Sequence, residues 1–319
     1  MAVSRTVLAL RALGLGDVLT GIPALRGLRR AYPGSRLVLA APAELATWLR
    51  GLGVVDDLVP TRGLEPLSWH GPAPDVAVNL HGRGPESHRL LQAVRPRDLV
   101  AFAAPDAGHA AGPDWPQGVH EVDRWCQLVR SVGGHCDADD LRLPGYPRGE
   151  HVVIHPGAAA GSRRWPAARW AQVAAHLAVI GCEVVVTGTA AEGSLCAAVA
   201  DADPRVVDAA GAHDLGGLSR LVGSAALLLS GDTGVAHLAT ALGTPSVLLF
   251  GPVSPALWGP RIDADLHRVL WHALAGDPPG DAHGSALDPR LARTEVPEVL
   301  DAARRLLARR TTADAARPA

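Results

Sequence analysis

Four polar stretches of this sequence follow apolar, strand-like runs, which is where open parallel sheets bind their ligands. They are the glycine-rich turn RALGLGDVLTG (11–21), the loop HPGAAAGSRRW (155–165), TGTAAEG (187–193) and SGDTGVAH (230–237). The first carries Asp17, a carboxylate that could accept a proton as a general base. The others carry arginines, a second carboxylate and a helix start, which are groups that bind phosphate oxygens and sugar hydroxyls.

The glycine-rich turn is similar to a dinucleotide-binding loop but lacks part of its pattern. That loop requires G-x-G-x-x-G, so that backbone amides at a helix N-terminus receive a pyrophosphate. Gly14 and Gly16 fit, whereas Leu19 stands in place of the third glycine. Asp17 adds a negative charge, and its repulsion of a phosphate in a poorly solvated turn would be on the order of several kcal/mol. The turn is therefore not expected to hold phosphate, and Asp17 is either a helix N-cap or a functional carboxylate.

The second half of the sequence supplies groups that suit an anionic ligand. Arg163 and Arg164 offer permanently charged, fork-shaped donors to phosphate oxygens, or they are two solvated arginines beside a core tryptophan. Glu192 follows the strand-like run EVVVTG (183–188) and is placed to hold ribose hydroxyls. The alternative for Glu192 is a first-turn acid that the helix dipole favours.

The stretch SGDTGVAH places a helix start directly after the apolar run ALLLS (226–230). The backbone N–H groups of a first helical turn lack partners within the helix. Thr233 and Gly234 could therefore offer donors to a diphosphate, with His237 one turn further on. In purely structural terms, Asp232 or Thr233 is an N-cap and His237 is a helix histidine with its own partners.

Strand-like and helical stretches alternate in two series, each of which begins with its own strand. The first series has strands at 7–10, 36–41 and 75–82 and helices at 18–32, 43–51, 86–94 and 119–132. The second has strands at 151–157, 183–188, 205–208, 226–230 and 245–251 and helices at 167–180, 191–201, 214–223, 234–242 and 295–310. This alternation predicts an α/β fold with two Rossmann-like, doubly wound domains facing across a cleft. The domains are expected at 1–145 and 150–310, joined through the Pro/Gly-rich stretch 141–150, with a disordered tail at 311–319.

Composition excludes several classes of function. All 30 basic residues are arginines, so chemistry that needs a Schiff-base or P-loop lysine is excluded. The net charge of −2, balanced in both halves, argues against nucleic acid as the main partner. The four cysteines lack metal-ligand spacing, and no metal site is expected. No apolar run approaches the roughly 18 residues of a membrane span and no signal peptide is evident, so a cytoplasmic location is expected.

Taken together, four blocks of the sequence look like the heptosyltransferase family, glycosyltransferase family 9. The blocks are GLGDVLTGIPALRGLRRAYP (14–33), HPGAAAGSRRWPAARWAQVAAHL (155–177), VVVTGTAAEGSL (184–195) and SGDTGVAHLATALGTPSVLLFGPVSPALWGP (230–260). They keep the family's order and spacing, and the resemblance covers most of residues 5–260. It implies the GT-B fold and an inverting, metal-independent transferase that typically uses ADP-heptose and a lipopolysaccharide core acceptor.

The resemblance also implies roles for residues by their positions. Asp17 corresponds to the general base in the acceptor domain. On the donor side, Arg163 replaces a basic residue, usually lysine, that holds the diphosphate, and Arg164 lies beside it. Glu192 corresponds to the acid at the ribose. The positions around the diphosphate and sugar are Asp232, Thr233, Gly234 and His237.

Further candidates on the acceptor side are Gly16, His81 and His120. His81 lies near a position where the family often has glutamine, and His120 begins HEVDRW (120–125), which is similar to a family stretch on that side. The alternative is that both are solvent or core histidines.

The residues and the resemblance predict a glycosyltransferase that moves a sugar, heptose from ADP-heptose by the resemblance, to a hydroxyl of a glycan, glycolipid or small-molecule acceptor. No cofactor is expected, and association with a membrane surface is left open. The alternative is a catalytically silent nucleotide-sugar-binding module of the same fold, against which the intact Asp17 and D-T-G block speak. Leu19 and the absence of an acid closing the second strand disfavour an NAD-dependent oxidoreductase.

Overall fold

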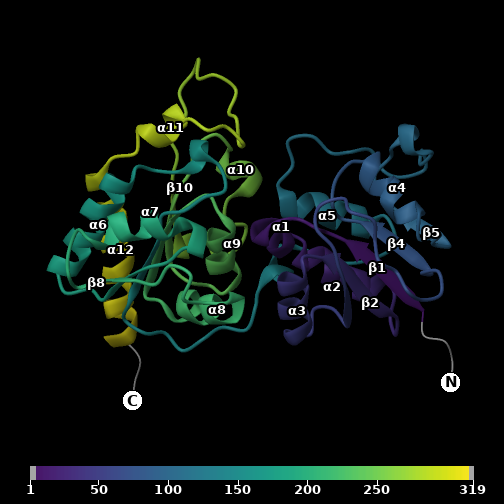
Figure 1. Ribbon diagram of the computed structural model, residues 1–319, viewed down its shortest axis with the longest axis horizontal. Coiled ribbons are helices and arrows are strands. Elements are labelled where there is room, and N and C mark those ends of the chain that lie inside the picture. The colour runs from purple at the N-terminus through teal and green to yellow at the C-terminus, as the bar shows by residue number, and fades with distance from the viewer. Residues whose placement is uncertain (1–4, 316–319) are drawn as a thin grey trace. The chain divides into compact units, whose positions relative to one another are not determined.

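The computed structural model describes residues 5–315, with side chains through residue 309. The chain divides into two compact units, Met1–Leu141 and Arg142–Ala319, each built on its own parallel sheet (Figure 1). The sequence places the boundary within 141–150, and the division between the units falls between Leu141 and Arg142.

In the described part of the first unit, five parallel strands form a sheet in the order β3-β2-β1-β4-β5. They are β1 (Thr6–Leu10), β2 (Arg36–Ala41), β3 (Asp57–Pro60), β4 (Val76–Asn79) and β5 (Asp98–Val100). Val, Leu and Ala dominate the central strands because a parallel sheet is buried on both faces. The strand order reverses between β1 and β4, which pair with Leu10 opposite Asn79.

The helices of this unit follow the strands in the alternation that the sequence predicts. They are α1 (Leu15–Thr20), α2 (Ile22–Ala31), α3 (Ala43–Gly51), α4 (Glu86–Gln92) and α5 (Glu121–Arg130), with 3-10 turns η1 (Pro105–Ala107) and η2 (Ala138–Leu141). The single helix expected over 18–32 is instead divided at Gly21 into α1 and α2. α5 packs against α2, and the loop side chains Leu67 and Trp69 help α4 to cover the sheet.

In the described part of the second unit, six parallel strands form a sheet in the order β11-β10-β9-β6-β7-β8. They are β6 (Val152–His155), β7 (Val184–Val186), β8 (Val206–Asp208), β9 (Leu227–Gly231), β10 (Ser246–Leu249) and β11 (His267–Leu270). Here the order reverses between β6 and β9, where His155 pairs with Ser230. Ligands of open α/β sheets bind at such reversals, beyond the carboxyl ends of the strands.

Helices flank this second sheet (Figure 1). They are α6 (Ala167–Val179), α7 (Gly193–Ala200), α8 (Leu215–Ser224), α9 (Gly234–Ala241), α10 (Pro255–Trp258), α11 (Pro289–Ala292) and α12 (Val296–Ala315), with 3-10 turns η3 (Gly161–Arg163), η4 (Ala190–Glu192) and η5 (Ala264–Leu266). Because crossovers between parallel strands are right-handed, the β6–β8 and β9–β10 connections place their helices on opposite faces. α6 accordingly packs with α7 and α12, and α8 with α9.

The closing helix α12 is longer than the sequence analysis expected. It continues through Ala315 instead of ending at 310, because neither glycine nor proline occurs before Pro318 to stop it. Residues 311–315 of the expected tail belong to this helix, and residues 316–319 lie outside the described part. Within residues 5–315, no helix combines the length and apolar character needed to cross a membrane.

Candidate functional site

Asp17 lies at the reversal of strand order in the first unit. The chain leaves β1, turns through Gly14 and enters α1, in which Asp17 occupies the first turn. The N-cap of α1 is Gly14, so the interpretation of Asp17 as an N-cap is wrong. Gly16 stands next to it within the same turn, and both residues are partly exposed.

The surroundings of Asp17 make its carboxylate more basic than that of an exposed aspartate. Burial raises its pKa most strongly, and the negative charge of Glu121 raises it further. The positive charge of Arg11 and the backbone N–H groups of Asp17 and Gly14 act in the opposite direction, but the net shift is upward. A raised pKa suits a general base, because proton transfer is favoured when the pKa approaches the working pH.

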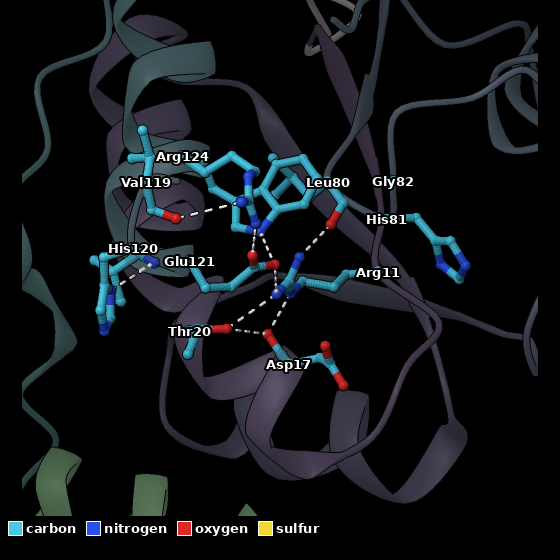
Figure 2. A network of polar contacts seen from close by, with 12 residues as sticks. Arg11, Asp17, Thr20, Leu80, His81, Gly82, Val119, His120, Glu121 and Arg124 are labelled. Carbon is cyan, nitrogen blue, oxygen red and sulfur yellow. Dashed lines mark hydrogen bonds and ion pairs between the residues drawn. The ribbon is translucent and has the colours of Figure 1, made fainter. Parts of the chain in front are cut away.

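A buried arginine holds the turn that carries Asp17 (Figure 2). Arg11, the first residue after β1, donates from Nε to the carbonyl oxygen of Asp17 and from Nη1 to that of Leu80. Its Nη2 donates to Thr20 Oγ1 at 2.9 Å and forms an ion pair with Glu121 at 3.2 Å. Figure 2 shows the carboxylate of Asp17 directed away from these contacts, so the network holds the backbone and leaves the reactive group outside it.

Glu121 is the acceptor at the centre of this network. Its Oε1 accepts from Trp125 Nε1 at 2.7 Å as well as from Arg11, and its Oε2 accepts from Arg124. The guanidinium carbon of Arg11 lies 4.9 Å from the centre of the Trp125 ring, a cation–π contact. Neither Arg11 nor Glu121 was predicted as a site residue, although Arg11 lies within the glycine-rich turn (11–21) and Glu121 within HEVDRW (120–125).

The two histidines suggested for the acceptor side bind backbone atoms. His81 Nδ1 accepts from the Ala12 N–H at 3.2 Å, and burial lowers the pKa of His81 to about 4. His81 is therefore neutral with its proton on Nε2, which remains a donor. His120 is the N-cap of α5, and its Nδ1 accepts from Val122 N–H. Of the two, His81 follows β4 and so lies at the same strand reversal as Asp17.

In the second unit, Arg163 and Asp232 come together at the strand reversal. Arg163 ends η3 in the loop after β6, and Asp232 follows β9. Arg163 Nη1 lies 3.4 Å from the Asp232 carbonyl oxygen and 4.0 Å from its Oδ2. Arg163 Nε is buried with no hydrogen-bond partner among the described residues. The guanidinium thus retains donor capacity at the position where anions bind in this fold class.

The start of α9 is not closed by a side-chain cap. Thr233 is the N-cap residue, yet its hydroxyl pairs with Ser230 Oγ at 3.1 Å instead of bonding to the helix. The helix begins at Gly234, and the positive end of its dipole lies beside Asp232. His237 is buried within α9, with its ring 5.7 Å from that of Trp258 in a T-shaped contact.

Glu192 lies in the first turn of η4, as its alternative, structural interpretation predicts. Its Oε2 accepts from Thr189 N–H and Thr189 Oγ1, both at 2.9 Å, and completes a capping box around η4. Its other oxygen lies against Gly157, where a Cβ would overlap it. Glu192 therefore closes the turn after β7 and lies against the loop after β6.

Two other side chains near these loops differ in their exposure. Arg164 is exposed and donates from Nε to the Ala158 carbonyl at 2.7 Å, so it stiffens its own loop. His155, which was not predicted as a site residue, is buried at the end of β6, and its Nδ1 has no partner in the described part of the chain. Burial lowers the pKa of His155, while the charge of Glu192 raises it, and the net shift is downward.

No group of three or more His, Cys, Asp or Glu suited to a metal ion occurs within residues 5–315.

Known proteins resemble this chain in both sequence and fold. The sequence model described as glycosyltransferase family 9 (heptosyltransferase) matches residues 115–272. Lipopolysaccharide heptosyltransferase 1 of Pseudomonas aeruginosa is 26% identical over 309 residues, which is 82% of each chain. Lipooligosaccharide heptosyltransferase 2 of Haemophilus influenzae is 30% identical over 167 residues, and the match spans about half (48%) of each protein.

Solved structures show the same fold. The ADP-heptose lipopolysaccharide heptosyltransferase II of Escherichia coli superposes with a TM-score of 0.77 at 20% identity, over 96% of this chain and 99% of that one. This likeness confirms the expected GT-B class, with a doubly wound parallel sheet in each unit. The four sequence blocks, the two sheets and these matches agree, and the chain carries a glycosyltransferase family 9 (heptosyltransferase) domain, matched over residues 115–272.

Proposed function

We propose that this protein transfers heptose from ADP-heptose to a sugar hydroxyl of a lipopolysaccharide-type glycan, with inversion and without a metal ion. The family match supports glycosyl transfer, and the named relatives act on lipopolysaccharide or lipooligosaccharide. The E. coli relative named for ADP-heptose supports the choice of donor. In this proposal the first unit handles the acceptor and the second unit handles the nucleotide sugar.

The proposed reaction is a single displacement. Asp17 takes the proton of the acceptor hydroxyl while the acceptor oxygen attacks the anomeric carbon of the donor. The bond between that carbon and the phosphate oxygen breaks, and the electron pair leaves with ADP. Arg163, Arg164 and the N-terminus of α9 would stabilise the growing charge on the diphosphate. Glu192 would hold the ribose, and Asp232 and His237 would contact the sugar end of the donor.

One observation carries the assignment of Asp17. The first turn after β1 carries the carboxylate of Asp17, whereas a phosphate-binding turn would offer backbone N–H groups alone. Burial raises the pKa of this carboxylate. This arrangement repels a phosphate and suits proton abstraction. His81, neutral and with Nε2 as a donor, is a second candidate contact for the acceptor.

The D17N variant tests this function. We expect kcat to fall about 10²–10⁴-fold, the usual contribution of a general base, because an amide does not take up the hydroxyl proton. Release of ADP is measured with ADP-heptose as donor and heptose-deficient lipopolysaccharide as acceptor. The Kd for ADP should stay within about twofold of that of the parent protein, since the change lies in the acceptor unit.

Two results would count against the proposal. Sugar transfer by D17N at the parent rate would remove Asp17 from the chemistry. Binding of ADP-heptose by the parent protein without any ADP release, with this acceptor present, would favour the catalytically silent binding module.

A further inference from the structure

The proposed reaction uses Asp17 but leaves unexplained the two buried charges beside it. Arg11 has no exposed surface and Glu121 is 5% exposed, and they form an ion pair between residues 110 positions apart. Replacing a buried ion pair with well-packed apolar side chains is often neutral or stabilising. Stability alone therefore gives little reason for this pair.

Arg11 ties together the two backbone segments that meet at the strand reversal. It donates to the carbonyl oxygen of Asp17 in α1 and to that of Leu80 after β4. Thr20 Oγ1 accepts from Arg11 at 2.9 Å and donates to the Asp17 carbonyl at 2.9 Å. A planar guanidinium directs several donors at fixed angles, which a lysine ammonium does not. The orientation of the first turn of α1 therefore depends on Arg11.

Glu121 contributes both a hydrogen-bond acceptor and a charge. It receives hydrogen bonds from Arg11, Arg124 and Trp125, so it fixes the far side of the Arg11 guanidinium. Its negative charge raises the pKa of Asp17, whereas the positive charge of Arg11 lowers it. The two members of the pair therefore act on Asp17 with opposite signs.

We propose that Arg11 and Glu121 are positioning residues for Asp17: Arg11 fixes the turn that presents the carboxylate, and Glu121 anchors Arg11 and balances its charge. The proposal deepens the function given above and rests on Asp17 as the base. The pair does not contact substrate in this scheme and acts through Asp17 alone.

Three other titratable or charged groups lie around this network (Figure 2). Arg124 is paired with Glu121 and stays charged. His81 is neutral near pH 7 because burial lowers its pKa to about 4. His120 uses Nδ1 to accept from the backbone at the start of α5. A change of charge at residue 121 therefore acts on Asp17 against a background of fixed charges from Arg11 and Arg124.

The direct test is an NMR titration of Asp17 in the full-length protein. The ¹³C carboxyl signal of Asp17, assigned by its loss in D17N, is followed from acid to neutral pH in the parent and in E121Q. Removing the negative charge removes its repulsion of the Asp17 carboxylate, so the pKa of Asp17 should fall. The acidic limb of the kcat profile should move to lower pH by the same amount.

Two further variants separate charge from geometry. W125F removes a hydrogen bond to Glu121 and alters the same packing without changing any charge, so it should leave the pKa of Asp17 in place. R11K keeps the positive charge but loses the fork, so kcat should fall roughly tenfold or more with little movement of that pKa. R11K also serves as the test if E121Q does not fold, as judged by circular dichroism.

The outcomes distinguish this proposal from the function on which it rests. An unmoved Asp17 pKa in folded E121Q, an equal movement in W125F, or parent kcat in R11K would overturn the proposal while leaving Asp17 as the base. Full activity of D17N would instead overturn the function, whatever the titration shows.

Discussion

At the scale of single residues, Arg163 carries the clearest expectation on the donor side. It is the arginine that lies beside Asp232 at the strand reversal and retains an unpaired Nε among the described residues. Hydrogen bonds to charged groups contribute about 1.5–3 kcal/mol, so R163A should raise the Kd for ADP roughly 10–100-fold. Isothermal titration of ADP into the full-length protein measures this.

The matched control for R163A removes the same charge elsewhere in the second unit. Arg205 forms an exposed ion pair with Asp203 before β8, away from the carboxyl ends of the strands, and R205A should leave the Kd for ADP unchanged. R163K should retain part of the affinity, since it keeps the charge and loses the fork. Equal affinities of R163A and R205A would show that Arg163 does not hold the diphosphate.

The sequence predicted those candidate residues that have a suitable side chain and closely follow a strand-like run. Asp17 and Arg163 each follow a strand-like run by a few residues, so local pattern was enough to select them. Arg11 and Glu121 could not be paired this way, because 110 residues separate them and only the folded structure brings the end of β1 and the start of α5 together. His155 was missed for a related reason: a histidine in an apolar strand usually belongs to the core, and only the structure shows its unpaired Nδ1.

At the scale of elements, Gly21 lies at the junction of α1 and α2, where helix propensity favours alanine and packing favours glycine. Gly21 has helical dihedral angles, at which alanine is intrinsically better by up to about 1 kcal/mol. A Cβ at this position would lie 2.6 Å from Arg11 Cδ and 2.8 Å from Arg11 Nε. Because Arg11 is buried and held by several bonds, overpacking should prevail, and G21A should lower the free energy of unfolding by about 1–3 kcal/mol.

Chemical denaturation of G21A beside a control measures this effect. Gly51 ends α3 and does not adopt a positive φ, and a Cβ added to it would meet no atom within 4 Å. G51A should therefore be neutral or slightly stabilising. A G21A protein as stable as G51A would mean that Arg11 moves aside without loss, contrary to the rigid turn inferred above.

The strands and α-helices that the sequence did not predict are short, with three or four residues each. The strands β3, β5 and β11 have three or four residues each and lie at the edges of the sheets, where polar residues such as Asp57 and Asp98 interrupt the apolar pattern. The central strands were recognised because burial on both faces requires continuous apolar runs. α10 and α11 span only four residues, too few for a helical period to be visible.

At the scale of the whole molecule, both units have a parallel sheet with a reversal of strand order, but different residue types lie at the two reversals. In the first unit, the loop after β1 presents a carboxylate on a turn held by a buried arginine. In the second, the loops after β6 and β9 present Arg163 and an N-terminus without a side-chain cap. The fold fixes where ligands bind, and the residue types at those positions decide which ligand each unit takes.

This division predicts how ligands stabilise the full-length chain. ADP at 100 times its Kd should stabilise the parent protein by about 2.7 kcal/mol. If the 319 residues unfold together, this corresponds to a rise of roughly 4 °C in Tm. D17N should show the same rise, because its altered side chain lies in the first unit, to which the proposal assigns the acceptor. R163A at the same ADP concentration should show a clearly smaller rise. A panel of ADP, GDP, UDP and dTDP in a thermal-shift assay then identifies the base, with ADP expected to act at the lowest concentration. If D17N lost the ADP response while R163A kept it, the nucleotide would bind at the glycine-rich turn, and the assignment of acceptor and donor to the two units would have to be exchanged.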